Sequence, residues 1–171
     1  MRKLIFIFSL FVGMSTMAIA QKTALVDMEY IMKNIPTYET ANEQLNIVSK
    51  KWQKEVEAQL TEVQTMYKNY QTELVFLSEE MKVKREEEIV AKEKEANALR
   101  NKYFGQEGEL FKKRESLIKP IQDEIYAAIQ ELVNEKKYDL IWDKSSSMNL
   151  IYSSSNLDIS DLVLEKLGYS K

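Results

Sequence analysis

The sequence contains no cysteine and no histidine, and these two absences exclude several kinds of functional site. Without cysteine the chain has no disulfide framework, and zinc sites of the Cys/His type cannot form. Without histidine neither a Ser-His-Asp triad nor a Cys-His dyad is available. Only 4 glycines and 2 prolines occur among the 171 residues, and no glycine-rich phosphate-binding loop is present. We therefore expect no cofactor, no metal and no enzymatic activity.

Two remaining motifs could suggest chemistry, but both have simpler interpretations. Lys144 and Ser145 could form a catalytic dyad, yet the serines at 145–147 and 153–155 are ordinary turn residues. The carboxylates of residues 86–88 are consecutive on a predicted helix. Consecutive helical residues point in different directions, so these side chains are poorly placed to share a metal ion.

The first 20 residues have the pattern of a secretory signal peptide. Arg2 and Lys3 precede an apolar stretch at residues 4–12, and residues 18–20 read Ala-Ile-Ala, an A-x-A cleavage site. We expect cleavage after Ala20 and export of the mature chain. A transmembrane anchor is the alternative, but the apolar stretch is only marginally long enough and is diluted by glycine, serine and threonine. The mature chain would carry 22 basic and 27 acidic side chains, and this net charge of −5 argues against nucleic acid as the main partner.

Residues 37–136 are predicted to form two long antiparallel helices. The segment is rich in glutamate, lysine, glutamine and alanine, which favour helix. Apolar residues recur every three or four positions from Leu45 to Leu77, as in a coiled coil, and every seven positions from Phe104 to Leu132. One unbroken helix of this length would measure about 150 Å. We therefore expect a hairpin that turns near 77–82, where Ser78 can cap the second helix.

Three residues disturb the returning half of this predicted hairpin. Gly105 and Gly108 each cost about 1 kcal/mol relative to alanine in a helix, and Pro120 removes one helical hydrogen bond. Counted back from the turn, the glycines fall opposite Trp52 and Val56. We favour the interpretation that they make room for this ring, and the alternative is a hinge, for which all three residues are candidates.

The two ends of the chain, residues 21–36 and 137–171, are predicted to form a small body containing β-strands. Residues 138–155 read YDLIWDKSSSMNLIYSSS, in which two apolar triplets flank a polar turn, and this pattern predicts a β-hairpin. Residues 23–28 are the other strand-like segment. A few short strands that are apolar on both faces cannot bury themselves, so we expect several copies to join into a body without open edges. The residues expected to form this body are Leu25, Val26, Leu140, Ile141, Trp142, Leu150, Ile151 and Tyr152.

The segments TALVDMEYIMKNIP and YDLIWDKSSSMNLIYSSSNLDISDLVLEKL, joined by a long charged helical hairpin, resemble the Skp/OmpH family of periplasmic chaperones. The resemblance implies a mainly α fold with a small β body, in which strands of a homotrimer form a barrel-like platform. Three coiled-coil arms would hang from this platform around a cavity. The implied function is that of an ATP-independent holdase that shields unfolded outer-membrane proteins in the periplasm. Because the best-known member is strongly basic and this chain is acidic, a uniformly positive cavity is not carried over. A peripheral membrane or lipopolysaccharide contact at the basic residues 112–114 has no support.

Candidate client contacts are the larger apolar and aromatic side chains of the arm, each of which could instead belong to the seam between the helices. They are Tyr67, Tyr70, Leu74, Phe76, Tyr103 and Phe104. Phe76 lies off the seam and is the best candidate. The alternative function is a structural coiled-coil adaptor of the cell envelope that docks one fixed partner. The charged sequence at 77–88 argues against a specific docking tip.

Overall fold

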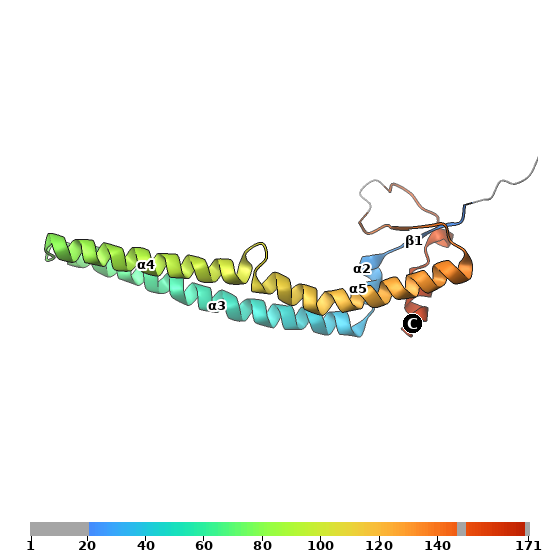
Figure 1. Cartoon of the computed structure of the whole chain (residues 1–171), viewed down its shortest axis with the longest axis horizontal. Coiled ribbons are helices and arrows are strands. Elements are labelled where there is room, and N and C mark those ends of the chain that lie inside the picture. Colours follow the sequence, from blue (N-terminus) through green and yellow to red (C-terminus); the bar gives the residue numbers. More distant parts are fainter. Residues whose placement is uncertain (1–20, 147–149, 170–171) are drawn as a thin grey trace, which may run out of the picture.

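The computed structural model describes residues 21–146 and 150–169, so the predicted signal peptide lies outside the described residues. The described chain forms a long helical arm with a small body at one end (Figure 1). A mainly helical fold with a small sheet is thus confirmed. Among the described residues, no helix is both long and apolar enough to cross a membrane. The elements in chain order are β1 (Thr23–Val26), α2 (Met28–Lys33), α3 (Pro36–Glu73), α4 (Glu79–Phe104), α5 (Glu109–Lys136), β2 (Leu140–Asp143), the 3₁₀ helix η1 (Ser155–Leu157) and α6 (Ser160–Lys166).

The arm consists of α3 running outward and of α4 followed by α5 running back beside it (Figure 1). Pro36 is the first residue of α3, a position at which the missing N–H costs no helical hydrogen bond. The chain reverses at residues 74–78, where the Ser78 hydroxyl oxygen accepts a hydrogen bond from Met81 N at 3.3 Å. Two glutamates follow in the first turn of α4, where the helix dipole favours negative charge.

The returning half of the arm is two helices, so the prediction of a single helix is wrong at residues 105–108. Gly105 ends α4 and Gly108 precedes α5, with extended ψ angles of 171° and 175°. The loop between them stands out from the arm (Figure 1). A Cβ atom on Gly105 would lie 2.4 Å from the carbonyl oxygen of Asn101, and one on Gly108 would lie 2.8 Å from that of Tyr103. The glycines are therefore explained by close approach to the backbone of α4, and not by the Trp52 ring. Pro120, in contrast, lies inside α5.

The sheet of the body joins the two ends of the chain. β1 and β2 are parallel, with Thr23 opposite Leu140 and Val26 opposite Asp143. On the other side of β1, Ile159 N donates to the carbonyl oxygen of Leu25 at 2.9 Å. The predicted antiparallel hairpin is wrong, because residues 150–154 have no regular structure.

Polar contacts after β2 explain why the chain does not fold back along that strand. The Asp143 carboxylate accepts hydrogen bonds from Met28 N at 3.2 Å and from Ser145 N at 3.0 Å. Lys144 N donates to the carbonyl oxygen of Val26 at 2.8 Å. These bonds fasten the end of β2 to the end of β1 and the start of α2, where a tight hairpin turn would otherwise begin.

One chain buries one face of this sheet by itself. Val26 packs with residues of α2, α5 and α6 such as Ile31, Ile125 and Val163, the last three of which are almost completely buried. The outer side of β2 has no such cover, since Leu140 and Trp142 are exposed. The body therefore has a covered face and an open face.

Candidate functional site

Large apolar side chains in contact with solvent are the main candidate for a binding surface on the arm. At its outer end Leu74, Val75, Phe76, Met81 and Val83 are all exposed. Phe76 is 86% exposed, in keeping with its position off the seam. These residues come from the turn and the first turns of α4, where the chain reversal leaves too few neighbours to cover them. The outer end of the arm, residues 74–83, therefore presents exposed apolar side chains among charged ones, and we call it the tip.

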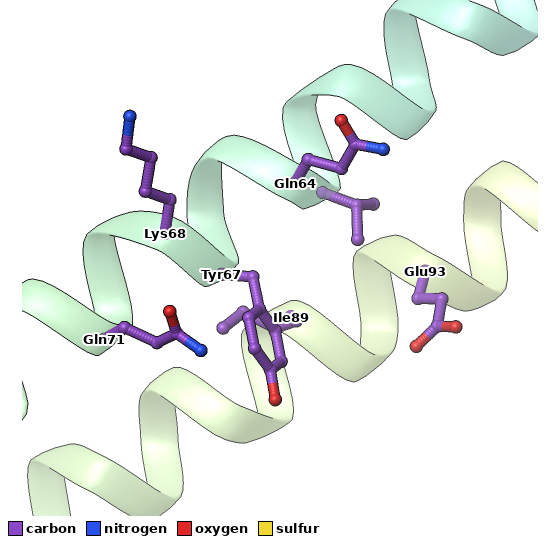
Figure 2. A pocket seen from close by; sticks show the side chains of 7 residues that line it. Gln64, Tyr67, Lys68, Gln71, Ile89 and Glu93 are labelled. Carbon is purple, nitrogen blue, oxygen red and sulfur yellow. The ribbon is translucent and has the colours of Figure 1, made fainter.

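A shallow groove between α3 and α4 lies a few turns from the tip (Figure 2). The ring of Tyr67 extends from α3 toward α4, where Ile89 is buried, and the ring is 54% exposed. Polar side chains surround this apolar centre, and the groove is lined by Val63, Gln64, Tyr67, Lys68, Gln71, Ile89 and Glu93. Such a surface can take an apolar side chain on the tyrosine and can offer amide hydrogen bonds to an extended backbone.

Two other tyrosines of the arm have partners within the chain. The Tyr70 hydroxyl donates to the Glu86 carboxylate, and this hydrogen bond raises the pKa of Tyr70 to about 12. The Tyr103 hydroxyl donates to Glu55 at 2.6 Å, which raises the pKa of Tyr103. Both bonds join the outgoing helix to α4, so these tyrosines stabilise the arm.

An aromatic cluster lies beside the loop at 105–108. The rings of Trp52 and Tyr103 are stacked, with centroids 4.7 Å apart and an angle of 7° between their planes. Phe104 meets Tyr103 edge to face at 6.3 Å and also lines a shallow groove with Val56 and Leu60. Stacked pairs contribute about 0.5–1.5 kcal/mol beyond their buried area. The cluster therefore stabilises the register of α4 on α3 that this structure shows.

Further exposed apolar side chains lie on β2 and on the segment at residues 150–152. Trp142 is 55% exposed and Ile151 is 100% exposed, and Leu140, Leu150 and Tyr152 are also exposed. We call these five residues the body patch. Exposed apolar side chains of this size make the body patch a candidate interaction surface.

The polar residues of the body form an ion-pair network that sequence analysis missed. Lys144 Nζ lies 2.6 Å from Asp158 and 3.5 Å from Asp27. Burial opposes ionisation of Asp158, but hydrogen bonds from Lys144 and Ser160 outweigh this effect and hold its pKa below the usual range. The hydrogen bond to Asp158 also raises the pKa of Lys144, and the Ser145 hydroxyl donates to the Asp143 carboxylate at 2.6 Å. Among the described residues, no cluster of three acidic side chains could hold a metal ion.

Residues 22–167 match a family model described as outer membrane protein (OmpH-like). The chain belongs to the OmpH-like family. This result confirms the family that the sequence predicted. A candidate outer membrane chaperone (OmpH-like) from Caulobacter crescentus CB15 has a similar solved structure, with a TM-score of 0.62. Its sequence is 15% identical, and the match covers 86% of this chain and 83% of that one, so the likeness shows a shared fold. No curated protein matches the chain.

The predicted site residues of this OmpH-like chain fall into separate places. Among the client-contact candidates, Leu74 and Phe76 belong to the tip, Tyr67 belongs to the groove, and Tyr103 and Phe104 belong to the aromatic cluster. The remaining candidate, Tyr70, is hydrogen-bonded to Glu86 within the arm. Among the candidates for the oligomeric body, Leu25 and Val26 are buried within their own chain and Ile141 is half-buried. The other five candidates make up the body patch.

Proposed function

We propose that this OmpH-like protein is an ATP-independent holdase chaperone of the periplasm. In this proposal, a homotrimer shields unfolded outer-membrane proteins in a cavity between its arms. The observation that carries the proposal is the presence of two separate exposed apolar surfaces, the body patch and the tip with its nearby groove. Membership of the OmpH-like family supports it, as does the fold shared with a relative described as a chaperone.

The body patch is suited to assembly. Burying a large apolar side chain contributes about 1.5–3 kcal/mol, and the patch offers five such side chains in each copy. β2 pairs with β1 on one side only, and an open strand edge is a template for pairing with another chain. Copies joined through this edge and patch would bury both together, and a closed ring of three would leave no edge open.

The tip and groove are suited to holding unfolded chains. Phe76 and Tyr67 are exposed aromatic side chains separated by polar surface. Each can make a weak contact with an apolar segment, and several arms together can hold one client through many such contacts. Binding of this kind needs no nucleotide, and it suits clients that share apolar character but no common sequence.

Mass measurement on the mature protein tests the proposal. We expect a complex of three copies at micromolar concentration, and one client added per trimer when a urea-unfolded outer-membrane barrel protein is diluted into it. Combined Tyr67→Ser and Phe76→Ser changes should weaken client protection and leave the trimer intact. The matched control is Tyr126→Ser, an exposed tyrosine of α5 near the body. A monodisperse monomer, or a trimer that leaves client aggregation unchanged, would contradict the proposal.

The second candidate function is an envelope adaptor that docks one fixed partner. The tip favours it, because Val75 and Phe76 form a small apolar surface that one partner could cover. Capture experiments separate the two candidates. A holdase retains many unfolded barrel proteins, whereas an adaptor retains one folded partner and loses it when Phe76 is changed to serine.

A further inference from the structure

The seven-residue spacing of the apolar seam in the returning half continues across the loop at 105–108 without a change. Five apolar residues of α4 and α5 occur at intervals of seven, and all five are buried or half-buried: Ile89, Ala96, Tyr103, Leu110 and Leu117. An uninterrupted seven-residue series is typical of one continuous helix facing a partner helix. The sequence thus supports a continuous helix through a segment that forms a loop in this structure.

The loop removes about one helical turn from the length of the arm. Gly108 N donates to the carbonyl oxygen of Gly105 at 2.9 Å. A Cβ atom on Gly108 would lie 2.9 Å from the Lys102 carbonyl oxygen, so the start of α5 abuts the last turn of α4. Four residues that would add about 6 Å to a helix are therefore displaced to the side.

We propose that residues 105–108 form a one-turn switch that sets the length of the arm. In the short state, shown here, the four residues form a loop. In the long state they join α4 and α5 into one helix, and α4 lies about 6 Å closer to the outer end of the arm. This proposal concerns a single arm and goes beyond the holdase function, on which it does not depend.

The glycine positions fit both states. In the loop, neither glycine can carry a side chain without meeting the backbone of α4. In a continuous helix, Gly105 and Gly108 would follow Tyr103 by two and by five residues. In a seven-residue repeat these are outer positions that face away from the partner helix. Alanine would therefore exclude the short state and suit the long state.

The long state gives up the hydrogen bonds of Tyr70 to Glu86 and of Tyr103 to Glu55, and the other contacts at the two ends of α4 can adapt to the movement. The stack of Tyr103 on Trp52 holds the short state, and a shift of one turn would bring Tyr103 to Val56 on the next turn of α3. At the tip, Leu74 already has helical backbone angles of −49° and −39°. Val75 and Phe76 have few contacts to lose, because both are mostly exposed. The turn at 74–78 can therefore absorb the displacement.

Distances between two spin labels test the switch. Because the natural sequence has no cysteine, labels attach only at the cysteines that are introduced. Cysteines replacing Glu95 in α4 and Glu115 in α5 span the loop. Their backbone separation is about 24 Å if four residues are looped out and about 30 Å in a continuous helix. Cysteines replacing Gln44 and Gln64, both in α3 and also 20 residues apart, form the control pair. Dilution with unlabelled protein restricts the measured distances to a single chain.

We expect the natural loop to give mainly the shorter distance. The double change Gly105→Ala and Gly108→Ala should lengthen it by about 6 Å and leave the control pair unchanged. Deletion of residues 105–108 should give the shorter distance alone. If the double alanine protein stays at the shorter distance, the switch is refuted.

A second variant covers the case in which the double alanine protein does not fold. Trp52→Ala removes the ring on which Tyr103 stacks and leaves the loop sequence intact. It should raise the population near 30 Å. Failure to raise this population in a folded Trp52→Ala protein overturns the proposal.

Discussion

Ile151 offers the sharpest test of the proposed assembly, because its side chain is completely exposed within one chain. Replacing it with aspartate removes no packing contact from the monomer. If the body patch is an interface, however, the change places a charge in a surface that has to be dehydrated on assembly. The effect on assembly should therefore be much larger than the effect on the folding of a single chain.

The size of the effect follows from the number of copies. Losing the burial of one isoleucine costs about 1.5–3 kcal/mol, so three copies lose about 5–9 kcal/mol of assembly free energy. A buried, unpaired carboxylate adds further cost. Each 1.4 kcal/mol is a factor of ten, so the trimer association constant should fall by at least about a thousandfold.

Sedimentation over a range of protein concentrations measures this change directly. The matched control is Ile47→Asp, which alters another exposed isoleucine on α3 in the arm, away from the body patch. We expect Ile47→Asp to assemble like the natural protein and Ile151→Asp to be monomeric at micromolar concentration, with an unchanged helical circular dichroism signal. An Ile151→Asp protein that assembles as tightly as the control would refute the assignment of the body patch as the interface.

Three further outcomes follow from the structure. Replacing residues 59–101 with a short turn should preserve the trimer and abolish client protection, as sedimentation and an aggregation assay would show; full protection by the shortened protein would contradict the cavity. Ser78→Ala should lower stability by about 0.5–2 kcal/mol in urea unfolding, because it removes the hydrogen bond that caps α4, whereas the exposed Thr65→Ala, away from any cap, should cost less. The pKa of Asp158 is depressed below its usual value of 3.8 in the folded state, so its contribution is present above about pH 4 and is lost as the pH falls. Asp158→Asn should therefore reduce the loss of stability as the pH falls below about 4, and an acid unfolding curve identical to that of the natural protein would contradict this assignment.

The arm was largely predictable because its signals are local. Helix propensity and the three–four spacing predicted the helices, and the serine followed by two glutamates predicted the cap of α4 within a few residues of the turn. The family was predictable from the ends of the chain, where strand-like and helix-capping residues occur in a fixed order. Candidate contacts such as Tyr67 and Tyr103 were harder to separate, because a seam residue and an exposed residue can share one sequence pattern.

The two wrong predictions, the β-hairpin and the continuous returning helix, concern places where the structure depends on residues far away in the sequence or on close approach of backbone atoms. The apolar pattern at 140–142 and 150–152 predicted a hairpin, but the carboxylate of Asp143 and the amide of Lys144 bind the ends of β1 and the start of α2, more than 100 residues earlier in the chain. A local pattern contains no information about that partner. At residues 105–108 the seven-residue spacing predicted helix, while the carbonyl oxygens of Asn101 and Tyr103 leave room only for glycine in the loop. The seven-residue spacing on both sides of these four residues therefore indicates helix, while their two glycines fit a loop, and the proposed switch requires this combination.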